Sequence, residues 1–195
     1  MRKFLLLAVL AAIAWFFWPD QGKRHPPGIL VAEEPIQTAV AENKPWEMNG
    51  YTITPLAEFQ LKARVLSRHR YWLDRESELS PIDLLLGWGP MTDQSVLDQL
   101  SLSQRSRWYE WEAGKLPIPG REIETHCANM HMVPANPEIK KQIKSARTGD
   151  IIELKGYLVA IEAADGWKWK SSLSRSDTAG GSCELVWVDA FSIVE

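Results

Sequence analysis

Residues 126–132 gather five side chains that could bind a soft metal ion. Two histidines, one cysteine and two methionines stand within seven residues: His126, Cys127, Met130, His131 and Met132. Imidazole suits zinc and copper, and thiolate and thioether sulfur favour Cu(I). On a strand, however, Cys127 and His131 face one way, whereas the other three side chains face the opposite way. One strand therefore cannot bring all five to one ion, and the simpler expectation is a core strand with hydrogen-bonded histidines.

Cys127 has two further chemical uses, as a nucleophile and as half of a disulfide. A catalytic thiol needs a base within about 3 Å. His126 would point to the opposite face of a strand, so His69 or His131 would have to supply that base through the fold. Cys183 is the second of the two cysteines in the chain. A Cys127–Cys183 disulfide is therefore the candidate pairing, and two buried free thiols are the alternative.

Aromatic residues that alternate with lysines offer a different chemistry. In Trp167-Lys168-Trp169-Lys170, strand geometry places both indoles on one face and both ammonium groups on the other. Residues 108–111 (WYEW) add three more rings. Such rings can stack on sugars or bases, with cations for acidic groups. The alternative is that these indoles pack into a small core and its rim, with Trp169 inside and Trp167 at the edge.

The polar run over residues 171–182 supplies the remaining candidate contacts. It is rich in serine and glycine and carries Arg175 and Asp177. Backbone N–H groups of such a loop can cradle an anion, although the run lacks the spacing and the lysine of a P-loop. The alternative is a long hairpin loop in which Arg175 and Asp177 pair locally. The candidate binding residues are therefore Trp167, Trp169, Arg175, Asp177, Asn129 and His131.

The amino terminus indicates where the protein works. Arg2 and Lys3 precede an uninterrupted apolar run over residues 4–18, a pattern typical of an export signal. The run ends in bulky aromatic residues, whereas signal peptidase needs small ones. We therefore expect residues 1–18 to remain as a transmembrane signal-anchor, with a cleaved signal as the alternative. A short charged amino terminus stays inside the cell, which predicts a single-pass protein of a bacterial inner membrane with a periplasmic C-terminal domain.

The rest of the chain divides into a linker and a domain. Residues 19–45 contain five prolines and no periodic apolar pattern, which predicts an extended, flexible linker. Residues 46–195 have a comfortable length for a single globular domain. The chain has a net charge of −3, which argues against nucleic-acid binding.

The pattern of the domain is mostly β. Alternating apolar residues over 51–56 and 59–73 predict long strands, and Asn136 followed by Pro137 predicts a helix that runs to about Ala146. The other expected elements are short helices over 80–86 and after Thr92 or Asp93, and strands over 106–112, 122–132, 151–163, 167–173 and 184–194. This arrangement predicts a β-rich α+β fold: a small antiparallel barrel or half-barrel, OB-like or related, with short inserted helices after an N-terminal transmembrane helix.

Three segments resemble an uncharacterised family of bacterial membrane-anchored proteins. They are GWGPMTD (87–93), HCANMHMVPAN (126–136) and SSLSRSDTAGGSCELVWV (171–188). The resemblance covers most of the domain and implies a single-pass membrane anchor. The family has no known activity, so the resemblance implies no catalytic role.

These patterns predict a membrane-tethered periplasmic module that binds or helps to assemble cell-envelope components. Its partner would be an envelope protein or a glycan. The N-terminal helix would hold the domain at the membrane. We expect binding rather than catalysis, with no cofactor, no metal and no nucleic acid. The rival interpretation is an envelope hydrolase or a soft-metal-handling protein that uses His126, Cys127 and His131.

Overall fold

A computed structural model describes residues 22–174 and 183–194. The expected signal-anchor, residues 1–18, lies outside the described residues. Within them, no helix has the length and apolar character needed to cross a membrane. In chain order the elements are β1 (Ile36–Thr38), β2 (Trp46–Met48), β3 (Tyr51–Arg70), α2 (Glu76–Leu79), β4 (Ile82–Gly87), η1 (Gly89–Thr92), α3 (Gln94–Leu97), β5 (Ser101–Arg105), β6 (Trp108–Glu112), α4 (Gly120–Thr125), β7 (Cys127–Pro134), α5 (Pro137–Ser145), β8 (Ile151–Ala163), β9 (Lys168–Lys170) and β10 (Glu184–Ile193).

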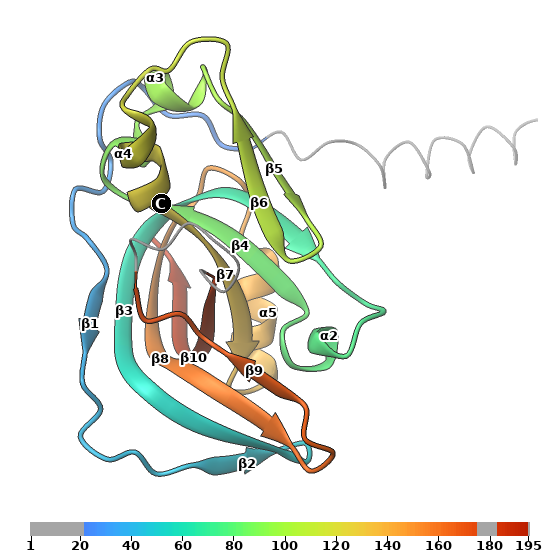
Figure 1. Cartoon of the computed structure of the whole chain (residues 1–195). Coiled ribbons are helices and arrows are strands. Elements are labelled where there is room, and N and C mark those ends of the chain that lie inside the picture. Colours follow the sequence, from blue (N-terminus) through green and yellow to red (C-terminus); the bar gives the residue numbers. More distant parts are fainter. Residues whose placement is uncertain (1–21, 175–182, 195) are drawn as a thin grey trace, which may run out of the picture.

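Five strands form a closed circle of backbone pairings, which we call the five-strand ring (Figure 1). Around it, β3 pairs with β4, β4 with β7, β7 with β10, β10 with β8, and β8 again with β3. The β7–β10 pairing is parallel and the other four are antiparallel, so the sheet is mixed rather than purely antiparallel as predicted. The reason is that β10 enters between β7 and β8, which run in opposite directions, and can be antiparallel to only one of them. The short strands β1 and β2 extend β3, and β9 extends β8.

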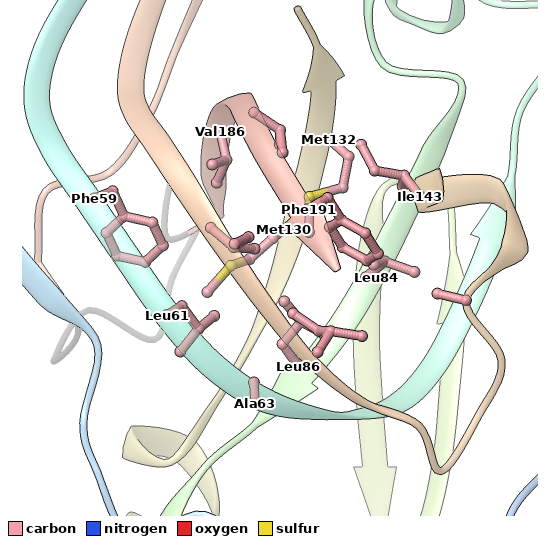
Figure 2. Close-up of a cluster of buried hydrophobic side chains, with 14 of the residues drawn as sticks. Phe59, Leu61, Ala63, Leu84, Leu86, Met130, Met132, Ile143, Val186 and Phe191 are labelled. Atoms are coloured by element: carbon pink, nitrogen blue, oxygen red, sulfur yellow. The ribbon is translucent and has the colours of Figure 1, made fainter. Parts of the chain in front are cut away.

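The inside of the ring holds the main hydrophobic core. Leu84 of β4 and Met130 of β7 face inward, whereas the neighbouring Asp83 and His131 face outward. Figure 2 labels ten side chains of this core, namely Phe59, Leu61, Ala63, Leu84, Leu86, Met130, Met132, Ile143, Val186 and Phe191. Helix α5 packs against β7 and β10 and contributes Ile143 to the same core.

Two smaller apolar clusters lie outside the ring. One surrounds Trp187 of β10, against which the Trp46 ring packs edge-on with centroids 5.0 Å apart. The other surrounds Leu85 and Cys127 and includes Ile123 of α4 and residues of η1, α3 and the β5–β6 hairpin. The long insertion between β4 and β7 is therefore held against the ring by its own apolar contacts.

Most of the expected elements are present, and two differ in type. Strands β3 and β8 are found, and α5 begins after Asn136, whose side chain accepts hydrogen bonds from two backbone N–H groups of the first turn. The segment expected as a helix over 80–86 instead contains the strand β4. Every residue of this strand is buried, and a strand buried on both faces lacks the alternation by which a half-exposed strand is recognised in a sequence. The strand expected over 122–132 begins at Cys127, after α4.

Several residues of the segment 22–45, which the sequence predicts to be a flexible linker, contact the ring. The backbone N–H of Lys23 donates to the carbonyl of Thr148 at 2.7 Å, Val31 is buried, and β1 pairs with β3. Gly149 has a φ of +91°, and a Cβ there would meet the Lys23 carbonyl oxygen at 1.9 Å, so this approach requires glycine. Backbone pairing of this kind leaves no periodic apolar pattern in the sequence.

Candidate functional site

The β5–β6 hairpin lies over the outer face of β4 and β7, and its turn carries Arg107 (Figure 1). Ser106 and Arg107 form the two-residue turn with φ angles of 52° and 69°. Such left-handed angles match the twist of a two-residue hairpin but cost a non-glycine residue about 1–2 kcal/mol. Contacts from the ring hold the turn in this conformation.

Arg107 is the centre of a buried ion network. One guanidinium nitrogen lies 2.9 Å from the carboxylate of Asp83, and the other lies 2.8 Å from that of Asp74. The Asp83 side chain is fully buried, and its second oxygen lies 3.0 Å from Nδ1 of His131, the residue directly opposite on β7. The guanidinium also lies over the Tyr71 ring, 3.7 Å from its centroid. We call these five residues the Arg107 clamp.

Hydrogen bonds to the backbone of the turn complete this arrangement. The Tyr71 hydroxyl accepts from the N–H of Arg107 at 2.9 Å, and the Asn129 amide donates to the Arg107 carbonyl at 2.8 Å. Gln104 donates to the Asn129 side-chain oxygen at 2.6 Å, and the Cys183 thiol lies 3.6 Å from the Arg107 carbonyl. The loop after β3, strand β7 and the residue before β10 thus converge on one turn.

The clamp sets the charge of its acidic and phenolic groups. Burial opposes ionisation of Asp74, but the hydrogen bond and charge of Arg107 prevail and hold the pKa of this carboxyl below its usual value. Burial, reinforced by the negative charge of Asp83, raises the pKa of Tyr71 to about 12. Near pH 7, Asp74 is therefore an anion that can pair with Arg107, and Tyr71 is a neutral phenol.

Trp167 and Trp169 cover the clamp and its surroundings instead of forming an exposed platform. Both are half-buried, and their ring centroids lie 6.1 Å apart in an edge-to-face arrangement. The Trp169 ring lies 4.9 Å from the ring of His131. The Trp167 ring lies 5.8 Å from that of Tyr51 and carries the guanidinium of Arg75 at 4.8 Å. Much of each indole face is thus taken by other side chains of the protein.

Beside the clamp, a cavity of about 270 Å³ opens between the hairpin and the ring. The hairpin contributes three rings and an acid to its wall, the residue after β4 contributes an indole, and α4 contributes a second acid. We call this cavity the aromatic–acidic pocket; it is lined by Trp88, Trp108, Tyr109, Glu110, Trp111 and Glu124, with Cys127, Asn129 and Glu184 beside them. The clamp holds the hairpin in place and so positions one wall of the pocket.

Acidic side chains predominate among the charged residues that line the pocket. Three glutamates line it, and among the residues that the structure describes no lysine or arginine does. Burial raises the pKa of Tyr109 well above its usual value, the neighbouring Cys127 thiol raises it further, and the charges of Glu124 and Glu184 add smaller contributions. The pocket therefore disfavours an additional negative charge and favours a positive one.

The two cysteines are free thiols, so the predicted Cys127–Cys183 disulfide is absent. The Cys127 thiol lies 3.1 Å from the carbonyl of Ile123 in α4, whereas Cys183 contacts the carbonyl of Arg107 on the hairpin. Each sulfur thus has a different backbone partner. Burial raises the pKa of the Cys127 thiol to about 12, so little nucleophilic thiolate is present near pH 7.

The residues considered for metal or thiol chemistry are spread over different surroundings. Cys127 and His131 lie outside the ring and Met130 lies inside it, as the alternation predicted. His126 precedes β7, and its Nδ1 lies 2.8 Å from the carbonyl of Glu122. Among the described residues, no group of three or more His, Cys, Asp or Glu side chains is arranged to hold a metal ion.

The structure brings four of the six predicted binding residues to the clamp. His131 belongs to it, Asn129 bonds to its turn, and Trp169 and Trp167 lie over or beside it. The other two, Arg175 and Asp177, lie outside the described residues.

Sequence reasoning missed the two central residues, Asp83 and Arg107. A signal for Asp83 was present, because a single acid inside the apolar stretch at 82–86 is unusual unless it is paired. Arg107 carries no comparable local signal, since its sequence surroundings are those of any polar turn. The pairing of these two residues depends on where the hairpin docks.

Comparisons with family models, with curated proteins and with solved structures find no significant match to this chain. The geometry of the site therefore carries the functional argument.

Proposed function

We propose that the protein is a glycan-binding module of the bacterial cell envelope built on a small OB-type barrel. In support, five strands close on themselves, and α5 connects the third strand of the ring to the fourth. OB barrels bind oligosaccharides and oligonucleotides on the face of strands two and three and with the loops after strands one and four. Of the corresponding parts here, the outer face of β4 and β7 and the connection from β8 to β10 border the aromatic–acidic pocket, whereas the loop after β3 does not line it.

The aromatic–acidic pocket lies at this face and is the observation that carries the proposal. Asn129 and Cys127 of β7 line it, together with Ser174 and Cys183 from the connection between β8 and β10. Its volume of about 270 Å³ falls just below the range of about 300–1,000 Å³ typical of pockets that enclose a whole small ligand. It suits one unit of a longer chain whose remainder lies outside.

The lining favours a sugar that carries a positive charge. Rings such as that of Trp108, which is 43% exposed, can stack on a sugar and attract a cation. Glu110 and Glu124 add attraction for a protonated amine. An envelope glycan with free amino groups satisfies both requirements.

The same geometry favours binding over the rival thiol chemistry. The Cys127 thiol contacts the carbonyl of Ile123 and the hydroxyl of Tyr109, and neither can act as its base near pH 7. The imidazole of His131 is turned to Asp83 beneath Trp169. The thiol is therefore engaged in hydrogen bonding, and the imidazole is held in a buried contact with Asp83 and in packing against Trp169.

Neutralising an acid of the pocket is expected to weaken the binding of an amino-sugar chain. The probes are a glucosamine tetrasaccharide, which is cationic, and the neutral N-acetylglucosamine tetrasaccharide. With the full-length chain in detergent, calorimetric titration should detect the first probe and show binding of the second that is weaker by about tenfold or more. The variant Glu124→Gln should bind the first probe about tenfold more weakly, which corresponds to about 1.4 kcal/mol.

Glu112→Gln is the matched control for this experiment. Glu112 is exposed on the same hairpin but does not line the pocket, so the affinity should not change. Equal affinities for the two sugars, or an unchanged affinity in Glu124→Gln, would contradict the proposal. Binding of a lysine-rich peptide in place of both sugars would reassign the pocket to a protein partner.

We also propose that the module is tethered to the inner membrane with its domain in the periplasm. The support is the pair of positive residues, Arg2 and Lys3, followed by an uninterrupted apolar run over residues 4–18. Full-length protein should then stay in the membrane fraction after carbonate and high-salt washes. Recovery of a soluble periplasmic form with a new amino terminus shortly after residue 18 would show that the signal is cleaved.

A further inference from the structure

The loop between β3 and α2 exposes two large apolar side chains at its tip. Trp72 is 76% exposed and Leu73 is fully exposed, the two highest values among the large hydrophobic residues of the described chain. Figure 1 shows this loop projecting from the body of the domain between β3 and α2. Exposing an indole and an isobutyl group side by side is unfavourable in water unless another surface covers them.

The residues on both sides of the tip are fixed to the domain. The N–H of Tyr71 donates to the carbonyl of Pro81 at 3.0 Å, and its ring lies under Arg107. On the other side, Asp74 pairs with Arg107 and accepts a hydrogen bond from the N–H of Ser77 at 2.7 Å. The fold therefore presents the two apolar side chains outward from a braced loop.

Basic residues flank the tip on the side of α5. Arg70, two residues before Trp72, donates to the carbonyl of Lys144 at 3.0 Å. Burial lowers the pKa of Lys144, and the nearby positive charges of Lys140 and Arg70 lower it further. These three cations therefore lie close enough to repel one another.

The acidic residues of the loop offset only part of this charge. Asp74 is paired with Arg107. Glu76 and Glu78 each keep a negative charge, since the hydrogen bond that Glu78 accepts from the Tyr51 hydroxyl does not remove it, so two acids stand against the three cations of the basic group. A surface of negative charge would relieve the repulsion among Arg70, Lys140 and Lys144.

We propose that Trp72 and Leu73 dock the domain on an anionic phospholipid surface, with Arg70, Lys140 and Lys144 facing its headgroups. Tryptophan prefers the boundary between headgroups and acyl chains, and basic side chains near a membrane are attracted by anionic lipids. A protruding apolar tip with cations on one side of it fits a planar bilayer. A protein partner would instead need a surface hollowed to receive the tip.

This docking goes beyond the glycan-binding proposal and does not depend on the pocket. Two apolar residues and three cations give a weak, reversible contact, which becomes effective when a tether holds the domain near the bilayer. The contact would fix the orientation of the domain on the membrane.

Quenching by brominated lipids tests the docking with the full-length chain. The protein is reconstituted into vesicles of acyl-chain-brominated phosphatidylcholine, alone or mixed equally with brominated phosphatidylglycerol, and tryptophan fluorescence is recorded. Anionic vesicles should quench more than neutral ones, and high salt should remove the difference. Trp72→Phe should remove most of this lipid-dependent difference, and Lys140→Gln combined with Lys144→Gln should reduce it.

Trp108→Phe is the control, because Trp108 is also partly exposed but lies on the hairpin. It should lower the total fluorescence and leave the difference between the two vesicles intact. If Trp72→Phe and the original protein show the same difference, or if neither shows one, the lipid-docking proposal is overturned and the tip becomes a candidate protein-docking site. Binding of the glucosamine tetrasaccharide should be unchanged in Trp72→Phe, so failure of docking and failure of the pocket proposal can be told apart.

Discussion

Replacing Arg107 with alanine is expected to lower the free energy of unfolding by about 3–5 kcal/mol. The carboxylate of Asp83 has no exposed surface, and Arg107 is the cation in contact with it at 2.9 Å. Removing the guanidinium leaves this charge buried without that partner, which costs more than the loss of one surface ion pair. The turn would also lose the contacts that hold Ser106 in a left-handed conformation. Urea-induced unfolding, followed by circular dichroism, measures the change.

Arg105→Ala is the matched control, because Arg105 is an exposed arginine on the same hairpin. Its effect should stay within about 0.5 kcal/mol. A double-variant cycle that pairs Arg107→Leu with Asp83→Leu should show a coupling energy of about 0.5–3 kcal/mol, because the double variant leaves neither charge uncompensated. An Arg107→Ala variant as stable as Arg105→Ala would show that the clamp does not hold the hairpin.

The strands that the sequence predicted well are those whose two faces differ in chemistry. β8 was expected over the residues it occupies, and β3 was recognised from long alternation, although it is one continuous strand. β4 was mistaken for a helix because Ser80 followed by Pro81 resembles the start of a helix, and the buried residues after them show no alternation that would indicate a strand. The contacts of residues 22–38 with the rest of the domain combine backbone hydrogen bonds with single side-chain contacts such as that of Arg24 with Asp98, and neither kind produces a repeating pattern in the sequence.

The site was predictable only where it depends on one segment. Alternation correctly placed Cys127 and His131 on one face of β7. That Asp83 stands opposite His131 depends on the register of β4 with β7. That Arg107 reaches Asp83 depends on the docking of a hairpin whose turn is 24 residues away from Asp83 in sequence. Such non-local contacts leave no trace in a single sequence.

Stability and binding are linked in this fold through the hairpin. Arg107 fixes the turn, and the next four residues, 108–111, line the pocket. The ion network therefore does more than join two charges, because it sets the position of one pocket wall relative to the ring. The other wall begins with Trp88, which belongs to the core.

Trp88→Ala is expected to destabilise the protein by about 3–5 kcal/mol, whereas Trp108→Ala should cost less than about 1 kcal/mol. Both indoles line the aromatic–acidic pocket, but Trp88 is 1% exposed and Trp108 is 43% exposed. Removing Trp88 opens a cavity at the junction of pocket and core, and its backbone N–H is tied to the carbonyl of His126 at 3.0 Å, which limits collapse of the site.

The same two variants separate a structural indole from a binding one. In urea-induced unfolding, the free energy of unfolding of Trp108→Ala should be close to that of the original protein. In titration with the glucosamine tetrasaccharide, its affinity should be reduced by about tenfold, because an exposed ring that stacks on the ligand contributes on the order of 1–2 kcal/mol. Trp88→Phe should recover much of the stability lost in Trp88→Ala, because an aromatic ring still fills most of the space. Equal stability losses in Trp88→Ala and Trp108→Ala would mean that the pocket wall formed by Trp88 is not part of the hydrophobic core. Unchanged sugar binding in Trp108→Ala would show that Trp108 of the hairpin does not contact the sugar.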